Sequence, residues 1–209
     1  MSSIIRPVAT PQAILLQPHK VLSATAEPAA GATPEVLQIL ENMLATVYRA
    51  DGVGIAAPQI GVSQRLVVID IGAERDDGKR DYSVKRPTFY INPEILWSSE
   101  ETSSRQEGCL SLPGLWGDVV RPSEVKIRYT DRDGAVVEEE LGGLASVCIQ
   151  HEIDHLDGIL FTQRMTKLRR DLANTKWQKL RRDLVKEGGE FDVIAAETGL
   201  IKSHHSKDK

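Results

Sequence analysis

The order of hydrophobic patterns along this chain predicts an α+β fold, with mixed or antiparallel β-sheets packed around a central helix. Strand-like segments fill the middle of the chain, and a helix with a His-Glu-x-x-His pattern follows them. Regular alternation of strands and helices would instead have indicated a parallel sheet. An N-terminal helix and a long C-terminal helix complete the expected architecture. A chain of 209 residues is long enough to bury one domain's core.

The composition narrows the class of protein. Hydrophobic residues make up 41% of the chain and charged residues 27%, as in ordinary soluble proteins, and a net charge of -4 gives no general reason to expect a nucleic-acid substrate. Cys109 and Cys148 are the only cysteines, which indicates reduced thiols and not a disulfide scaffold. No apolar run approaches the ~20 residues of a membrane span, and none resembles a signal-peptide core. We expect a cytoplasmic protein.

The first helix is expected after a mostly extended stretch, 1–33, that is rich in Pro, Ala, Ser and Thr. Thr33 suits the N-cap and Pro34 the first turn. Asp51-Gly52 ends the pattern. Between these signals, apolar residues recur at helical spacing and give one buried stripe: Val36, Leu37, Leu40, Met43, Leu44 and Val47.

Small residues dominate the next segment, 52–59, which ends in Gln59. They allow the backbone to approach another group closely, because no side chains hold it away. Its Gly-x-Gly follows a helix and not a strand, which disfavours a nucleotide-binding loop. A tight helix-to-strand connection is the alternative reading of these small residues. Gln59 adds an amide that can donate and accept hydrogen bonds.

The strands are expected in the middle of the chain, and a charged loop or hairpin end over 72–86 separates the first from the second. A turn at 131–134 joins the last two as a hairpin. The four segments are 65–70, 89–92 closed by Pro93, 125–130 with period-two alternation, and 135–141.

The helix that follows carries the chemistry. His151 and His155 lie four residues apart, so both imidazoles face the same side and can bind one metal ion, while Glu152 suits a general base. Leu144, Val147 and Cys148 share the face of the histidines, which places the metal at the wall of an apolar cavity. Gly158 suits the helix end. Two histidines do not complete a catalytic site.

Three routes to a third ligand remain, and each gives a different enzyme. The metzincin pattern fails at its last position, which is Phe161. A downstream carboxylate, as in thermolysin-like proteases, would be Glu187 or Glu190, both in a Gly-rich tail. The upstream candidate is Cys109, whose thiolate with two histidines leaves a fourth position open. We favour Cys109 over an inert buried thiol at this position.

A further, C-terminal helix is expected from Thr166 to about Val185, with many basic residues around an apolar stripe. A solvated amphipathic helix is favoured over a dedicated interaction helix.

Three blocks together resemble the peptide deformylase family, specifically its bacterial-type class. They are Gly52-Val-Gly-Ile-Ala-Ala-Pro-Gln59, Glu107-Gly-Cys-Leu-Ser111 and Gln150-His-Glu-Ile-Asp-His-Leu-Asp-Gly158, and the similarity runs from about Leu15 to Leu184. The resemblance implies a metal-dependent hydrolase that removes the formyl group from the N-terminal formyl-methionine of nascent polypeptides and releases formate. It implies one divalent ion per chain, with Fe(II) as the native metal and Zn, Ni or Co as substitutes.

The resemblance also implies roles for the matching positions. Cys109, His151 and His155 would bind the metal, and Glu152 would transfer protons. The Gln59 amide and the Leu110 N–H would stabilise an oxyanion.

The remaining implied roles concern the substrate. The backbones of Gly54 and Gly108 would pair with the peptide, and the methionine pocket would be lined by Leu144, Val147 and Cys148. One departure is Trp116, which stands where some members have a substrate-holding Arg, although Arg121 follows. Side-chain preference beyond the methionine should therefore differ.

The resemblance finally suggests the domain organisation and partners. We expect one catalytic domain over 1–186 and a polar, flexible tail over 187–209. The partners are N-formylmethionyl peptides and, through the basic C-terminal helix, the ribosome; a membrane and a direct nucleic-acid substrate are not expected.

Overall fold

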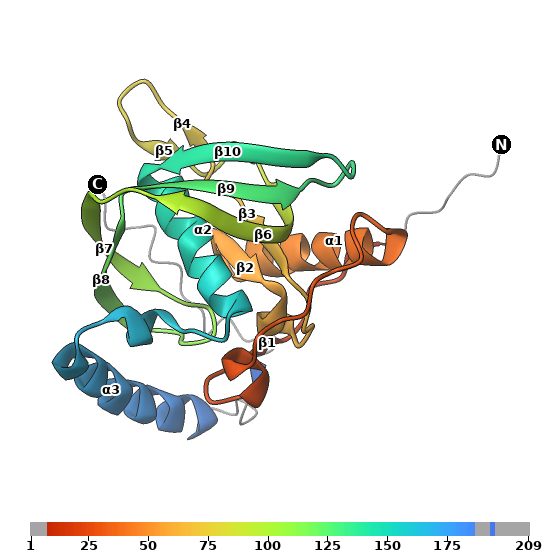
Figure 1. Ribbon diagram of the computed structural model, residues 1–209. Coiled ribbons are helices and arrows are strands. Elements are labelled where there is room, and N and C mark those ends of the chain that lie inside the picture. Colours follow the sequence, from red (N-terminus) through yellow and green to blue (C-terminus); the bar gives the residue numbers. More distant parts are fainter. Residues whose placement is uncertain (1–7, 187–192, 195–209) are drawn as a thin grey trace.

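An antiparallel five-stranded sheet forms the centre of the computed structural model, which describes residues 8–186 and 193–194 (Figure 1). The α+β class predicted from the sequence is confirmed. Along the sheet the strands are β10 (Val136–Gly142), β9 (Glu124–Thr130), β6 (Thr88–Ser98), β3 (Leu66–Ile69) and β2 (Gly54–Ala56). The expected hairpin is formed by β9 and β10. The short strand β2 lies at one edge of the sheet.

Helices cover the two faces of this sheet. α1 (Pro34–Arg49) begins as predicted, with the Thr33 hydroxyl accepting a hydrogen bond from the Val36 N–H. Its apolar stripe packs with Leu66 and Val68, whereas Val67 and Ile69 face the other side with α2 (Gly143–Leu156). This division follows from the period of two in β-strands, where successive side chains point to opposite faces.

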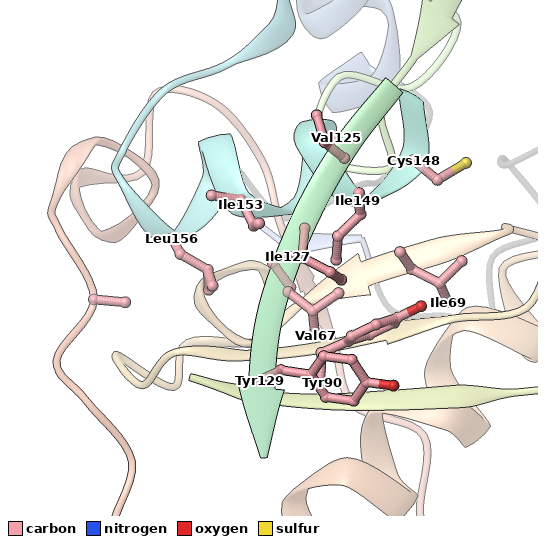
Figure 2. Close-up of a cluster of buried hydrophobic side chains, with 12 residues drawn as sticks. Val67, Ile69, Tyr90, Val125, Ile127, Tyr129, Cys148, Ile149, Ile153 and Leu156 are labelled. Atoms are coloured by element: carbon pink, nitrogen blue, oxygen red, sulfur yellow. The ribbon is translucent and has the colours of Figure 1, made fainter. Parts of the chain in front are cut away.

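The α2 face of the sheet is densely packed. Cys148, Ile149, Ile153 and Leu156 of α2 belong to one cluster with strand residues, and Figure 2 shows Ile149 directed towards Ile127. Every residue of α2 from Ser146 to Leu156 is buried, so the helix is enclosed and not merely amphipathic. A buried polar side chain must find hydrogen-bond partners, and the polar residues of α2 are therefore expected to be structural or catalytic.

Smaller elements surround this centre. β4 (Ala73–Glu74) and β5 (Arg80–Asp81) form a short hairpin within the expected charged loop, and β1 (Ile14–Leu15) pairs with β11 (Val193–Ile194). The 3-10 turns are η1 (Lys20–Ser23), η2 (Ala57–Ile60) and η3 (Phe161–Arg164). The stretch before α1 is otherwise largely extended from residue 8 onward. The predicted tail 187–209 lies outside the described residues except for 193–194.

A second hairpin was missed by the sequence patterns. β7 (Thr102–Gly108) pairs with β8 (Trp116–Pro122), and α3 (Lys167–Lys186) lies alongside it (Figure 1). β7 consists mostly of exposed polar residues, so it shows no alternation between apolar and polar positions. Beneath the hairpin, Leu115, Val119, Phe161, Ala173 and Trp177 belong to a separate apolar cluster.

The predicted end of one strand was wrong. Pro93 does not close the strand that begins near Phe89, because β6 continues to Ser98. The pairing register with β9 shifts between Ile91 and Glu94, and Asn92 has a φ of 54°. An irregularity of this kind accommodates a proline, which cannot donate a ladder hydrogen bond.

Among the described residues, none of the helices is both long and apolar enough to span a membrane.

Candidate metal centre

Three potential metal-ligand atoms converge from two segments. His151 and His155 lie one turn apart on α2, and Cys109 directly follows the last residue of β7. The Cys109 Sγ lies 3.1 Å from the His155 Nε2, and one ligand atom of each of the three residues lies within 4.8 Å of the others. The sequence-predicted ligand set is thus brought together, with each residue buried or half-buried.

The second nitrogen of His151 is held by a carboxylate. The His151 Nδ1 lies 2.7 Å from the Glu107 Oε2, which leaves Nε2 directed away from this contact. Burial opposes ionisation of Glu107, but hydrogen bonds from His151 and Arg121 outweigh it and lower its pKa to about 2. Glu107 is therefore ionised and fixes the orientation of the imidazole, as carboxylates behind metal-binding histidines commonly do.

A buried ionic network extends behind Glu107. Arg121 on β8 donates to both Glu107 oxygens, at 2.6 and 3.0 Å, and to the Asp154 carboxylate of α2 at 2.8 Å. Arg164 of η3 also binds Asp154. Two carboxylates and two guanidinium groups balance one another, which offsets the large cost of burying each charge alone. Arg121 is committed to this network and does not line the central pocket described below.

The sequence patterns did not predict this ionic network, which consists of Glu107, Arg121, Asp154 and Arg164. Glu107 and Asp154 flank the predicted ligands in sequence, which was the available signal. Arg121 and Arg164 reach them only through the packing of β8 and η3 against α2.

The donor set suits a divalent transition metal. A thiolate with two imidazole nitrogens is a ligand set used for such ions, and it leaves a coordination position for another group. Burial and the neighbouring His151 hold the pKa of His155 well below its usual value, which keeps His155 in the neutral form that binds metals. Burial opposes protonation of His151, but hydrogen bonds to Cys109 and Glu107 raise its pKa.

Glu152 has an unpaired carboxylate oxygen beside the ligands. Among the described residues, none forms a hydrogen bond with the Glu152 Oε2, although this atom is buried. Burial raises the pKa of Glu152 to about 7. A buried carboxylate oxygen without a partner is costly in a folded protein, so its presence here indicates a role toward a group in the pocket.

Gln59 is held with its amide directed at Cys109. The Gln59 Oε1 accepts a hydrogen bond from the Ala56 N–H at 2.9 Å. The Nε2 therefore faces the other way, where it lies 3.1 Å from the Ser111 Oγ and 3.6 Å from the Cys109 Sγ. Because the carbonyl is fixed by the backbone, the NH₂ group is presented to the centre as a donor.

A central pocket of about 480 Å³ opens beside these groups. It contains all but one of the sequence-predicted site residues, the exception being His155, which is buried behind it. The sequence-predicted lining residues are Gly54, Gln59, Gly108, Cys109, Leu110, Leu144, Val147, Cys148, His151 and Glu152. Burial raises the pKa of the Cys148 thiol to about 12, so this cysteine stays protonated and does not compete as a thiolate ligand.

Two glycines in the pocket are in close contact with side chains. A Cβ on Gly54 would lie 2.6 Å from the Glu152 Oε1, and one on Gly108 would lie 2.8 Å from the Trp116 ring. A larger residue at either position would therefore force the neighbouring side chain, Glu152 or Trp116, to move. The predicted segment of small residues allows close approach to the Glu152 carboxylate, in addition to connecting α1 to β2.

The other positions considered for a third metal ligand are Phe161, Glu187 and Glu190. Phe161 is buried and stacks on the His151 ring, with centroids 6.0 Å apart. Its position near the centre is therefore occupied by a packing group that cannot bind a metal. Glu187 and Glu190 lie outside the described residues.

Comparisons with a family model and with curated proteins point to the same family. The polypeptide deformylase family model matches residues 11–171. The peptide deformylase of Phenylobacterium zucineum is 42% identical over 163 residues, covering 78% of this chain and 92% of the relative. That of Methylocella silvestris is 45% identical over 157 residues, covering 75% and 78%.

Solved structures agree. A crystal structure of peptide deformylase from Ehrlichia chaffeensis has a TM-score of 0.76 at 32% identity, covering 84% of this chain and 99% of that chain. A crystal structure of peptide deformylase from the same organism in complex with actinonin has a TM-score of 0.74 at 32% identity, covering 83% and 99%.

Proposed function

This chain belongs to the polypeptide deformylase family, and from that premise we propose that Cys109, His151 and His155 hold its metal ion. The protein is a metal-dependent hydrolase that removes the N-terminal formyl group from the formyl-methionine of nascent polypeptides. The observation that supports this ligand set most strongly is the convergence of a thiol and two imidazoles beside a carboxylate oxygen without a partner.

Glu152 is the proton carrier in this proposal. A divalent ion, when bound, acts as a Lewis acid that polarises a carbonyl group and makes water more acidic. The Glu152 Oε2 accepts a proton from the attacking water and later gives it to the departing amine nitrogen. General acid–base catalysis by one positioned carboxylate typically contributes about 10²–10⁴ in rate. Its position against Gly54 limits where the carboxylate can lie.

Gln59 and Leu110 stabilise the negative charge that develops on the formyl oxygen. The hydrogen bond from the Ala56 N–H fixes the Gln59 amide so that its NH₂ group already points to the centre. Such donors stabilise the transition state without reorganising during the reaction. The Leu110 N–H follows Cys109 directly in the chain, and Leu110 lines the central pocket.

The peptide is held as an added strand. Gly54 is on β2 at the edge of the central sheet, and Gly108 ends β7 of the second hairpin. Backbone groups at both positions can pair with an extended peptide placed between them. Leu144, Val147 and Cys148 then provide an apolar wall for the methionine side chain, because all three line the central pocket.

We propose Fe(II) as the native ion. The thiolate and imidazole set also accommodates zinc, nickel or cobalt, so the bound ion depends on availability as well as affinity. Metal analysis of protein prepared without oxygen tests this: iron near one equivalent per active chain is expected, and zinc as the dominant ion under those conditions would contradict it.

We also propose a cytoplasmic location and contact with the ribosome through α3. The nascent polypeptide substrate emerges from the ribosome. The helix carries eight basic and two acidic residues, in contrast to the net charge of -4 for the whole chain. Co-sedimentation with ribosomes that weakens with added salt is expected, and Arg182→Glu should reduce it. Equal co-sedimentation of both proteins would contradict the contact.

A chain ended after Lys186 tests the proposal that residues 1–186 form the catalytic domain. This shortened chain should retain full formate release.

The central experiment measures formate from formyl-Met-Ala-Ser. The metal-loaded protein should release formate while internal peptide bonds remain intact. Glu152→Gln should bind metal as wild type does but lose at least about 100-fold in rate. Equal rates in the two proteins would refute the role of Glu152.

A cysteine pair tests the ligand set. Cys109→Ala should lose the metal, whereas Cys148→Ala, which removes a buried thiol of the same pocket, should keep it. Retained metal and activity in Cys109→Ala would redirect attention to Glu187.

A further inference from the structure

A second hollow adjoins the central pocket, and we propose that it binds the part of the formylated peptide that follows its first three residues. This inference rests on the proposed function. The hollow has a volume of about 250 Å³ and is lined mainly by residues of β8 and α3. Leu115 and Trp116 line both this hollow, which we call the α3 groove, and the central pocket. A peptide that extends past these two residues therefore enters the α3 groove directly.

One stripe of α3 forms a wall of the groove. Arg169, Leu172, Ala173 and Lys176 all line it, and their spacing of three, four and seven residues places them on the same side of the helix. Ala173 is buried at the centre of this stripe, and its small side chain leaves space there. Leu172 is 64% exposed, which makes it an apolar surface available to a ligand.

The opposite wall comes from β8. Trp116 pairs with Gly108 across the hairpin, and its ring lies over the position where a Gly108 side chain would be. Trp116 is 41% exposed, so its ring offers a broad apolar face at the boundary between the two hollows. Gly117 leaves room for the Met165 side chain, which lines the groove from below. Aromatic and thioether surfaces of this kind adapt to varied apolar side chains.

The charges of the groove indicate what the bound segment carries. Asp118 is already paired with Arg169 at 3.2 Å, at one end of the stripe. Lys176 lies two helical turns away from Arg169, at the other end. A peptide segment with an apolar side chain followed by a carboxylate matches Leu172 and Trp116 together with Lys176. The groove thus selects for acidic residues a few positions downstream of the formyl-methionine.

Paired peptides test this selection. Each pair is an amidated formyl-Met-Ala-Ser-Leu peptide extended to seven residues, with either Glu or Lys at position five, six or seven and Ala at the other two. Because exposed ion pairs contribute ~0.2–1 kcal/mol, wild type should prefer Glu over Lys by about 1.4- to fivefold in kcat/KM at one or more positions. The Glu-to-Lys ratio should fall towards one at ~0.5 M salt, because the electrostatic screening length is then only about 4 Å.

Matched charge reversals identify the residue. Lys176→Glu should abolish or invert the Glu-to-Lys ratio, whereas Lys179→Glu, the same change on the same helix outside the groove, should keep it. The ratio is measured within each variant, so a lower fraction of active protein does not affect it. Equal ratios in wild type and Lys176→Glu at all three positions would overturn the proposal. Formate release from formyl-Met-Ala-Ser by wild type separates that outcome from failure of the deformylase assignment.

Discussion

Replacing Gly54 with alanine tests whether contact with β2 positions the Glu152 carboxylate, the proposed proton carrier. The new Cβ would lie 2.6 Å from the Glu152 Oε1. An ordinary carbon–oxygen contact is about 3.3 Å, so the carboxylate must move by about 0.7 Å. Displacements near 1 Å at a reacting centre cost on the order of 100-fold in rate, so kcat should fall about 10- to 100-fold. Gly54 lies in an extended strand, where alanine is allowed.

The assay separates positioning from binding and folding. The variant keeps the backbone N–H and C=O of residue 54, so KM for formyl-Met-Ala-Ser should change less than kcat. Metal content should match wild type, because Gly54 is not one of the three proposed ligand residues. Gly142→Ala is the matched control, since a Cβ there would meet only ordinary contacts at 3.7 Å or more. An unchanged kcat for Gly54→Ala, or a rise confined to KM, would refute the positioning argument.

Three further predictions concern other parts of the site and the fold. Glu107→Gln removes the charge that orients His151 and should weaken metal affinity about 10- to 100-fold in chelator competition. The control Asp118→Asn, on the exposed side of β8, should leave metal affinity unchanged. Equal affinities in Glu107→Gln and wild type would contradict the orienting role. Gln59→Leu should lower kcat/KM by about 100-fold or more while metal content stays constant, and a loss under threefold would remove Gln59 from the oxyanion site. Burial raises the pKa of Asp70, but hydrogen bonds from Tyr48 and two backbone N–H groups outweigh it and hold the pKa below its usual value. The stability from Asp70 is therefore present above about pH 4 and lost as pH falls through the folded-state pKa, so urea denaturation should show Asp70→Asn less stable than wild type at pH 6, with a smaller difference at pH 3; a constant difference would refute this sign.

The ionic network behind the metal centre connects the chemistry to the outer elements. Arg121 joins Glu107 of β7 to Asp154 of α2, and Arg164 joins the same aspartate to η3. Removing one member would leave a buried charge without its partner, which is far more damaging than loss of an exposed ion pair. The candidate ligands are thus supported through Glu107 by Arg121, Asp154 and Arg164, none of which lines the central pocket.

Some features of this protein are determined by local sequence alone. The spacing of His151 and His155 requires only a helix to bring two imidazoles to one side, and Thr33 with Pro34 marks a helix start through local backbone hydrogen bonding. Cys109 was favoured as third ligand because thiolate chemistry suits the open site and Phe161 cannot bind a metal. These inferences need no knowledge of distant contacts.

Tertiary structure decided the rest. β7 was missed because its exposed polar residues lack a hydrophobic period, and β6 passes Pro93 because a register shift against β9 accommodates it. The reason for Gly54 became clear only when β2 was placed against Glu152, and the α3 groove exists only where Ala173 faces Trp116's strand. Periodicity records which side of an element is apolar, but it does not record which element lies opposite, and pairs such as Gly54 and Glu152 are joined only by folding.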